Sequence, residues 1–249
     1  MARHQHRDAV DPTAFLHAAG HPVRWQLLSE LATSDRQVQE LTALLNQPQN
    51  LVSYHLGLLR KAELVSTRRS TADGRDIYYR LDLVRCGNML TATGAALHPA
   101  LRMTRPLPPP HLRASVLFLC TGNSSRSQMA ETLLRRAAGS TVEARSAGSH
   151  PKAVHPSAIE LFPELGDARP KHLDEYTGQH FDYVITLCDR VREICPELPG
   201  HPQATHWSMP DPARDPEGLP AFVRTATELD ERIGFLLHRI AAHQASEAS

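Results

Sequence analysis

Residues 115–131 read SVLFLCTGNSSRSQMAE, and this stretch decides the fold of the second half of the chain. The apolar run Val116–Leu119 predicts a short buried strand, which ends at Cys120 because the composition changes there to Thr, Gly, Asn and Ser. A helix-like apolar pattern begins near Met129, and Ser127 is the expected N-cap. The sequence therefore predicts a strand, a tight loop and a helix in immediate succession.

The predicted loop begins at Cys120 and ends at Arg126, with five residues between them. A loop wound this tightly before a helix turns backbone N–H groups inward and can bind a tetrahedral oxyanion at the positive end of the helix. Arg126 adds a two-pronged hydrogen bond to the anion, and the same field favours the thiolate of Cys120, so covalent catalysis is expected. A serine-rich turn beside a core cysteine is the simpler alternative. The predicted oxyanion-binding residues are Thr121, Gly122, Asn123, Ser124, Ser125, Arg126 and Ser127.

The segment CTGNSSRSQMAE resembles the active-site loop that low molecular weight protein tyrosine phosphatases share with thiol-dependent arsenate reductases of the same fold. The resemblance implies that Asn123 holds the loop in its turn and that Ser127 hydrogen-bonds the Cys120 thiolate. It also implies that Asp211, which precedes a proline, protonates the leaving oxygen, although an ordinary Asp-Pro turn is the alternative. The loop fits both enzymes, so the choice between them depends on residues further along.

Two further cysteines favour the reductase. Hydrolysis of a phosphoester needs one cysteine, whereas reduction of arsenate to arsenite needs two electrons and a second sulfur that can close a disulfide. The segment VITLCDRVREIC supplies Cys188 at the end of a predicted strand and Cys195 seven residues later. This pair resembles the resolving cysteines of thioredoxin-coupled arsenate reductases, which implies a relay from Cys120 through Cys188 to Cys195. Two unrelated cysteines are the alternative.

The expected substrate is a small inorganic anion. After Asp211 the chain continues Ala213-Arg214-Asp215, without the aromatic residues that line a phosphotyrosine pocket. We expect arsenate as substrate, no bound cofactor or metal, and thioredoxin or a low-molecular-weight thiol as the external reductant. A tyrosine phosphatase and an oxyanion sensor with incidental turnover are the competing hypotheses. The predicted catalytic residues are Cys120, Arg126, Asp211, Cys188 and Cys195.

Strands and helices alternate through the second half of the chain. The strand-like segments that follow the first strand are 141–146, 181–187 and 203–207. Helical segments lie between them, and a long amphipathic helix is predicted over 219–243. This alternation predicts an α/β domain with a four-stranded parallel sheet and an active site at the carboxyl ends of the strands, where Cys120 and Cys188 both lie.

The first half of the chain has the pattern of a winged helix-turn-helix domain. Apolar residues recur at helical spacing, and a polar turn at 46–49 joins the last two helices. Two strand-like segments flank an Asp-Gly turn and predict a β-hairpin wing. The predicted helices are 11–19, 22–32, 38–45 and 51–62, the predicted strands are 64–70 and 75–83, and a closing helix is predicted over 86–101.

The segments NQPQNLVSYHLGLLRKAELV and IYYRLD resemble the winged-helix repressors of the ArsR type. The resemblance implies a homodimer, formed through this domain, that binds palindromic operator DNA. Founding members bind arsenite with a cysteine pair that this half lacks, since Cys86 is its only cysteine, so the inducer is left open. The predicted DNA-binding residues are Gln49, Asn50, Ser53, Tyr54 and His55 on the recognition helix and Arg68, Arg69 and Arg75 on the wing.

Charge and composition agree with two domains in 249 residues. Residues 1–110 carry 13 Lys and Arg against 9 Asp and Glu, whereas residues 111–249 carry 14 against 18, so only the first half is mildly basic. We find no secretory signal and no membrane span, and we expect a cytoplasmic protein. The predicted division is a winged-helix domain over 1–95, a proline-rich linker over 96–112 and a catalytic domain over 113–246.

Overall fold

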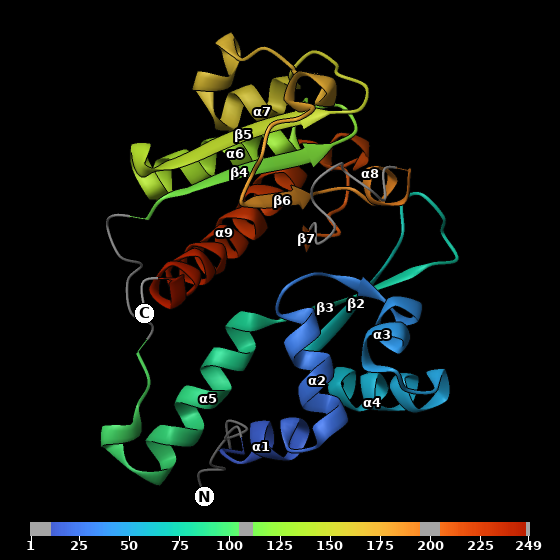
Figure 1. Ribbon diagram of the computed structural model, residues 1–249, viewed down its shortest axis with the longest axis vertical. Helices are drawn as coiled ribbons and strands as arrows, with labels where there is room; N and C mark the ends of the chain where they lie inside the picture. The colour runs from blue at the N-terminus through green and yellow to red at the C-terminus, as the bar shows by residue number, and fades with distance from the viewer. Residues whose placement is uncertain (1–10, 105–111, 195–204, 248–249) are drawn as a thin grey trace, which may run out of the picture. The chain divides into compact units, whose positions relative to one another are not determined.

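The computed structural model describes residues 11–104, 112–194 and 205–247. The chain divides into two compact units. The first comprises residues up to 69 together with 75–106, and the second comprises 70–74 together with 107–249. Each unit has its own hydrophobic core, and Figure 1 shows a helix-rich first unit and a second unit built on a sheet.

The helices of the first unit begin and end at capping residues that the sequence supplies. The ring of His21 accepts the Val23 N–H at 3.2 Å, and Pro22 occupies the first turn of its helix. The backbone N–H of Gln37 donates to Glu40 in a capping box, and Asn46 ends the same helix in the left-handed conformation. The helices are α1 (Ala14–Ala19), α2 (Pro22–Leu31), α3 (Val38–Leu45), α4 (Gln49–Lys61) and α5 (Leu83–Leu97).

The predicted hairpin consists of β2 (Val65–Arg69) and β3 (Ile77–Leu81), which pair antiparallel. A two-residue strand, β1 (Arg36–Gln37), pairs with the other side of β3, so the order in this sheet is β1-β3-β2. The sequence did not predict β1, because two residues are too few to carry a period. Together with α3 and α4, the hairpin completes a winged helix-turn-helix.

The second unit contains the predicted four-stranded parallel sheet, in the order β5-β4-β6-β7. The central strand pairs on both sides and is buried from Val116 to Cys120, as expected for a strand covered on both faces. Cys120 lies opposite Gly148 on the neighbouring strand, so the carboxyl ends of the strands meet at one edge. The strands are β4 (Ala114–Cys120), β5 (Val142–Gly148), β6 (Tyr183–Thr186) and β7 (Thr205–His206).

Helices pack on this sheet through apolar faces. Helix α6 packs against β4, β5 and the long helix α9, which the view in Figure 1 shows running beside the sheet. The buried residues of α9 recur at helical spacing: Phe222, Leu229, Ile233, Leu237 and Ile240. The α-helices are α6 (Arg126–Ala138), α7 (Pro156–Leu161), α8 (Asp189–Ile194) and α9 (Leu219–Glu247). Short 3-10 segments are η1 (Pro99–Leu101), η2 (Gly139–Thr141), η3 (Pro163–Asp167), η4 (Leu173–Tyr176) and η5 (Pro212–Arg214).

Several predicted boundaries differ from the structure. Helix α1 begins at Ala14 instead of Asp11, because Asp11 accepts the Thr13 N–H at 2.8 Å in a turn before the helix. Helix α5 runs over Leu83–Leu97, so it begins and ends a few residues before the predicted helix at 86–101, because Asp82 caps it by accepting the Arg85 N–H at 2.8 Å. Residues 105–111, which contain most of the predicted linker prolines, lie outside the described residues. Among the helices described, none is long and apolar enough to cross a membrane.

Candidate active site

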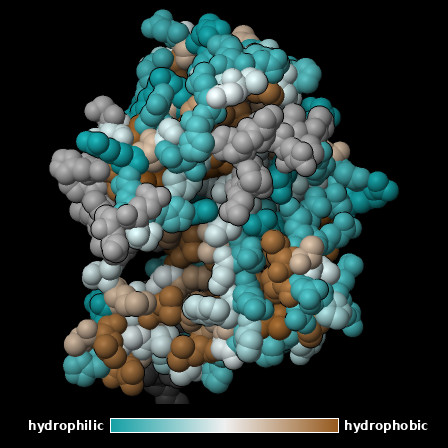
Figure 2. All heavy atoms as spheres, viewed as in Figure 1, coloured by the Kyte–Doolittle hydropathy of each residue, from teal (hydrophilic) through white to brown (hydrophobic). Residues whose placement is uncertain are grey.

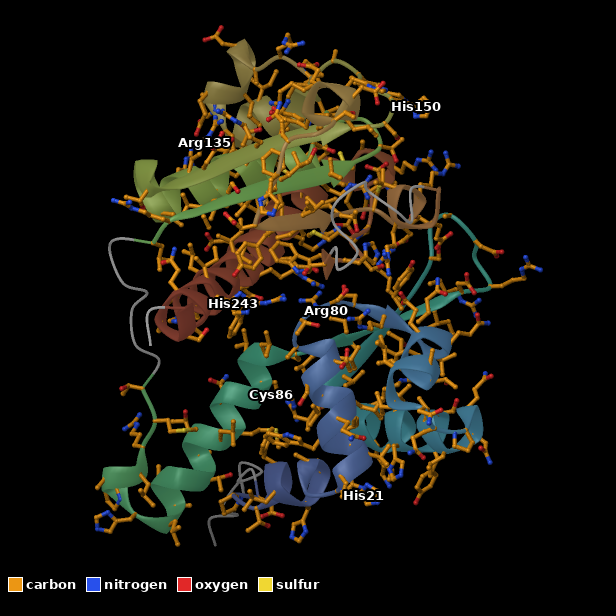
Figure 3. The ribbon with its side chains drawn as sticks, in the orientation of Figure 1. His21, Arg80, Cys86, Arg135, His150 and His243 are labelled. Atoms are coloured by element: carbon orange, nitrogen blue, oxygen red, sulfur yellow. The ribbon has the colours of Figure 1, made fainter. Side chains whose placement is uncertain are left out.

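The loop at 120–126 connects β4 to α6. Its carbonyl groups point outward and accept hydrogen bonds from a neighbouring segment. The segment after β5, where His150 lies in Figure 3, donates three backbone hydrogen bonds to the loop. These bonds, each 2.8 Å long, run from His150 N to Thr121 O, from Lys152 N to Gly122 O and from His155 N to Ser124 O. The C=O and N–H of a trans peptide point in opposite directions, so the N–H groups of the same peptides turn toward the inside of the loop. The inside of the loop therefore offers the donors that an oxyanion needs.

Asn123 fixes the shape of this loop. Its φ of 42° lies in the left-handed region, and its backbone N–H is 3.2 Å from Cys120 Sγ. The side-chain amide is fully buried and uses both of its ends. Its Nδ2 donates to Ser127 Oγ and Ser146 Oγ, each at 2.9 Å, and its Oδ1 accepts from Gln128 Nε2 at 3.0 Å and from Lys171 N at 2.8 Å. An amide with four partners holds a strained turn in one conformation.

Ser127 contacts Cys120 instead of capping the helix. Its Oγ lies 3.0 Å from Cys120 Sγ, the contact that the family resemblance implies. The prediction that Ser127 is the N-cap was wrong, because α6 begins at Arg126 and the cap position belongs to Ser125, whose side chain makes no capping hydrogen bond. A helix that begins closer to the loop places Ser127 beneath the sulfur.

Arg126 is a buried cation, and its two terminal guanidinium nitrogens are held by protein groups. Its Nη1 donates to Met209 O at 3.0 Å, and its Nη2 lies 3.4 Å from Asp211 Oδ2. Its Nε is buried and has no hydrogen-bond partner among the described residues. This N–H is therefore a donor that an oxyanion bound in the loop can use. Asp211, with a side chain 27% exposed, lies beside the same guanidinium.

Cys188 lies beside the same loop. Its sulfur is 3.3 Å from Thr121 Oγ1, and the side chain is almost completely buried. Burial is the main cause that raises the pKa of the Cys188 thiol; Arg126 opposes this rise, and the nearby charge of Cys120 adds to it. The structure thus brings Cys120, Arg126, Asp211 and Cys188 together, whereas Cys195 lies outside the described residues. Within the described ranges, no three His, Cys, Asp or Glu side chains converge on a metal position.

Residues 115–246 match the family described as low molecular weight phosphotyrosine protein phosphatase, over more than half of the sequence. The chain belongs to this family. Residues 21–67 match a second family, the bacterial regulatory proteins of the arsR family. The family domain therefore follows an ArsR-type helix-turn-helix region in one polypeptide.

The relatives that this half of the chain matches include arsenate reductases. That of Halalkalibacterium halodurans is 35% identical over 126 residues, which cover 47% of this chain and 91% of the relative. That of Brevibacillus brevis is 34% identical over 125 residues, which cover 49% and 92%. The solved arsenate reductase of Archaeoglobus fulgidus is 30% identical over 49% of this chain and 98% of its own, with a TM-score of 0.40. The C-terminal unit is therefore an enzyme domain of the arsenate reductase type.

The predicted DNA-contacting side chains do not all lie on the surface of the first unit. Four of them are exposed at the start of α4: Gln49, Asn50, Ser53 and Tyr54. His55 is only 4% exposed, and its ring centroid lies 4.4 Å from that of His21, so it is removed from the proposed base contacts. On the wing, Arg69 and Arg75 are exposed and Arg68 is half-buried.

Sequence reasoning missed Gln128 and Lys171, two residues that support the loop. Gln128 and Lys171 both bind the Asn123 amide, and Ser146 connects that amide to Glu131. Lys171 is 48 positions from Asn123 and reaches it through a backbone N–H, which leaves no pattern in the sequence. For Gln128, its position next to Ser127 was the only signal.

Proposed function

We propose that this chain reduces arsenate to arsenite in the cytoplasm by a cysteine relay and also binds operator DNA as a homodimer. The observation that carries the enzymatic half is the position of Cys188, whose sulfur is 3.3 Å from Thr121 of the oxyanion loop. A phosphatase of this fold needs no second thiol there, whereas a two-electron reduction does.

The first half of the reaction forms a bond between sulfur and arsenic. The Cys120 thiolate attacks arsenic in an arsenate that the loop N–H groups and Arg126 hold, and Asp211 donates a proton to the oxygen that leaves as water. Cys188 then attacks Cys120 Sγ, the S–As bond breaks and its electron pair stays on arsenic. Arsenite leaves, and a disulfide joins the two sulfurs.

The second half restores Cys120. Cys195 attacks Cys188, which displaces the Cys120 thiolate and leaves a disulfide between Cys188 and Cys195. An external reductant, thioredoxin or a low-molecular-weight thiol, reduces that disulfide. One arsenate and two thiols thus give one arsenite, one disulfide and one water.

The raised pKa of Cys188 fits the order of these steps. Burial raises it most, Arg126 lowers it and the charge of Cys120 raises it further, so an ionised Cys120 disfavours the thiolate of Cys188. When Cys120 becomes bonded to arsenic, its charge no longer opposes ionisation of its neighbour. Cys188 therefore becomes nucleophilic after the adduct forms.

Arsenite release by the purified chain tests the enzymatic proposal. With thioredoxin, thioredoxin reductase and NADPH, we expect turnover that disappears in Cys120→Ser and in Cys188→Ser, while Cys86→Ser, in the other unit, retains it. A thiol-trapping mass spectrum after one turnover should show the Cys188–Cys195 disulfide. If Cys188→Ser turns over normally and the chain hydrolyses an aryl phosphate briskly, the domain is a phosphatase.

The regulatory half of the proposal is supported by the first unit's surface. Large hydrophobic side chains are exposed there, and Figure 2 shows brown atoms gathered over this unit, as expected if a second copy covers part of it. The exposed side chains include Leu16, Trp25, Leu44, Leu97, Leu101 and Met103. Sedimentation should give a dimer, and duplexes selected from a random pool should contain a palindrome. If arsenate changes operator affinity in Cys188→Ser, the enzyme domain is a sensor.

A further inference from the structure

We propose that Lys171 is a positioning residue for Cys120, which it reaches through a chain of buried hydrogen bonds. The inference deepens the proposed function, since it names a residue that prepares the nucleophile of that reaction. Lys171 lies before η4 and far from the loop in sequence, yet it binds the supports of the loop twice. Its backbone N–H donates to Asn123 Oδ1 at 2.8 Å, and its Nζ donates to Glu131 Oε2 at 3.2 Å.

The hydrogen bonds from Lys171 to the sulfur are continuous and run through buried side chains. Glu131 Oε2 accepts from Ser146 Oγ at 2.5 Å, and Ser146 Oγ accepts from Asn123 Nδ2 at 2.9 Å. The same Nδ2 donates to Ser127 Oγ, which lies 3.0 Å from Cys120 Sγ. The intermediate residues Glu131, Ser146, Asn123 and Ser127 are each 4% exposed or less.

The carboxylate of Glu131 and the backbone N–H of Lys171 together set the direction of the bonds in this chain, since the first can only accept and the second can only donate. A carboxylate can only accept, so Ser146 must donate its proton to Glu131 and must accept from Asn123. The amide nitrogen of Asn123 then donates its second proton to Ser127. The hydroxyl of Ser127 accepts that bond and keeps its own proton for Cys120 Sγ, which stabilises a thiolate in place of a thiol.

Lys171 supplies a positive charge next to the Glu131 oxygen that accepts from Ser146. Glu131 is a buried anion with two cationic partners on different oxygens. Arg135, labelled on α6 in Figure 3, binds Oε1 from a half-exposed position, whereas Lys171, with a side chain 17% exposed, binds the Oε2 that also receives Ser146. A buried carboxylate that loses a charged partner reorganises, and Ser146 and the Asn123 amide that it holds then lose their fixed positions.

A cavity reaches this pair from the surface and makes the proposal testable by chemical rescue. It has a volume of about 340 Å³ and is lined by residues that include Glu131, Arg135 and Lys171. In Lys171→Ala, a small ammonium ion added to the solution can therefore enter the space that the lysine side chain leaves. An ammonium without N–H groups supplies charge but no hydrogen bond, and serves as the control.

The experiment compares Lys171→Met with Arg135→Met in the full-length chain. Both remove one cation from the same carboxylate, but only the first removes it from the oxygen that binds Ser146. We expect Lys171→Met to lower kcat/KM for arsenate about tenfold or more, mainly through kcat, and to raise the pH at which iodoacetamide half-labels Cys120. Arg135→Met should change both by less than about threefold. Lys171→Arg should restore most of the loss, which shows that the fold is intact.

Rescue separates positioning from a structural effect. Methylammonium should restore at least part of the activity of Lys171→Ala and return the labelling profile toward lower pH, and tetramethylammonium at equal ionic strength should do neither. Unchanged Cys120 labelling in Lys171→Met would overturn the inference, as would equal effects of Arg135→Met or equal rescue by both ions. Cys120 labelling needs no arsenate turnover, so this result stands apart from the fate of the proposed reaction.

Discussion

At the scale of single residues, the oxyanion loop depends on a glycine that packs against it, because a Cβ atom there would collide with the loop backbone. Gly148 lies opposite Cys120 on the neighbouring strand, and the loop backbone passes directly over its Cα. A Cβ atom built at Gly148 would lie 2.6 Å from Thr121 O and 2.7 Å from Asn123 N. Backbone atoms cannot move aside as a flexible side chain can, so this position admits only glycine without displacing the loop.

We therefore predict that Gly148→Ala lowers kcat/KM for arsenate about 100-fold or more, because a shift of the loop by about 1 Å misaligns the attacking sulfur. Gly234→Ala is the matched control, since nothing lies within 4 Å of its Cβ position in α9. That variant should keep full activity and gain up to about 1 kcal/mol in its free energy of unfolding. Steady-state kinetics and thermal unfolding measure both, and a fully active Gly148→Ala would contradict the packing argument.

A second prediction concerns the ionisation of Cys188. The charge of Cys120 contributes to its raised pKa, so Cys120→Ser should lower the pKa of Cys188 and increase its iodoacetamide labelling at any given pH. Mass spectrometry of the labelled peptide measures the rate against pH. Cys86 is an internal reference, because burial raises its pKa to about 11 and it belongs to the other unit. If Cys188 labels at the same pH with and without Cys120, the two sulfurs are not coupled.

At the scale of elements, α4, the second helix of the helix-turn-helix, is held in the first unit by a buried histidine. His55 faces His21, which is the N-cap residue of α2. The Nδ1 atom of His55 is buried and has no hydrogen-bond partner among the described residues. Burial is the main cause that lowers the pKa of His55, and the nearby charges of His21 and Arg24 lower it further. A neutral histidine therefore packs well between the two helices and a protonated one does not.

The sign of the resulting pH dependence follows from the lowered pKa. The unfolded chain takes up the proton near the ordinary value of 6.5, whereas the folded chain resists it. The stability that neutral His55 contributes to the first unit is therefore fully present above about pH 6.5 and declines as the pH falls below it. Hydrogen exchange of α4 should speed up between about pH 7.5 and 5.5 after correction for the intrinsic rate. His55→Gln should remove most of that change, and an unaltered profile would sink the argument.

At the scale of the whole molecule, the chain combines a basic half with an acidic half and is neutral overall. Binding to the phosphate backbone depends on the local distribution of charge, so a neutral chain can still carry a DNA-binding domain. The exposed arginines of the wing, Arg69 and Arg75, lie at the turn end of the β2–β3 hairpin. Their contribution is expected to be sequence-independent, in contrast to that of Gln49 and Asn50.

We predict that Arg69→Ala or Arg75→Ala weakens binding to a selected duplex and to random DNA by a similar factor. Each should reduce the slope of log K against log salt by about one for every phosphate that the variant no longer binds. Fluorescence anisotropy at several salt concentrations measures this slope. Arg136→Ala in the second unit is the control and should leave the slope unchanged, and a weakening confined to the selected duplex would assign the wing to base reading.

The elements that could be predicted are those whose causes are local. The strand, loop and helix around Cys120, the helix-turn-helix and the wing all follow from neighbouring residues, because apolar period, turn residues and caps act within a few positions. The short strand β1 and the position of Ser127 escaped prediction, since pairing with β3 and the point where α6 begins depend on the rest of the unit.

By itself, the sequence determined the candidates for the chemistry: a cysteine and an arginine at the ends of one loop, a later Asp-Pro and a further cysteine after a strand. Only the tertiary structure decided which of them meet, that His55 is buried and that Lys171 supports the loop. Thr121 and Cys188 are 67 positions apart, and Asn123 and Lys171 are 48. Contacts across such distances come from the register of a parallel sheet and the packing around it, and no local pattern in the chain encodes them.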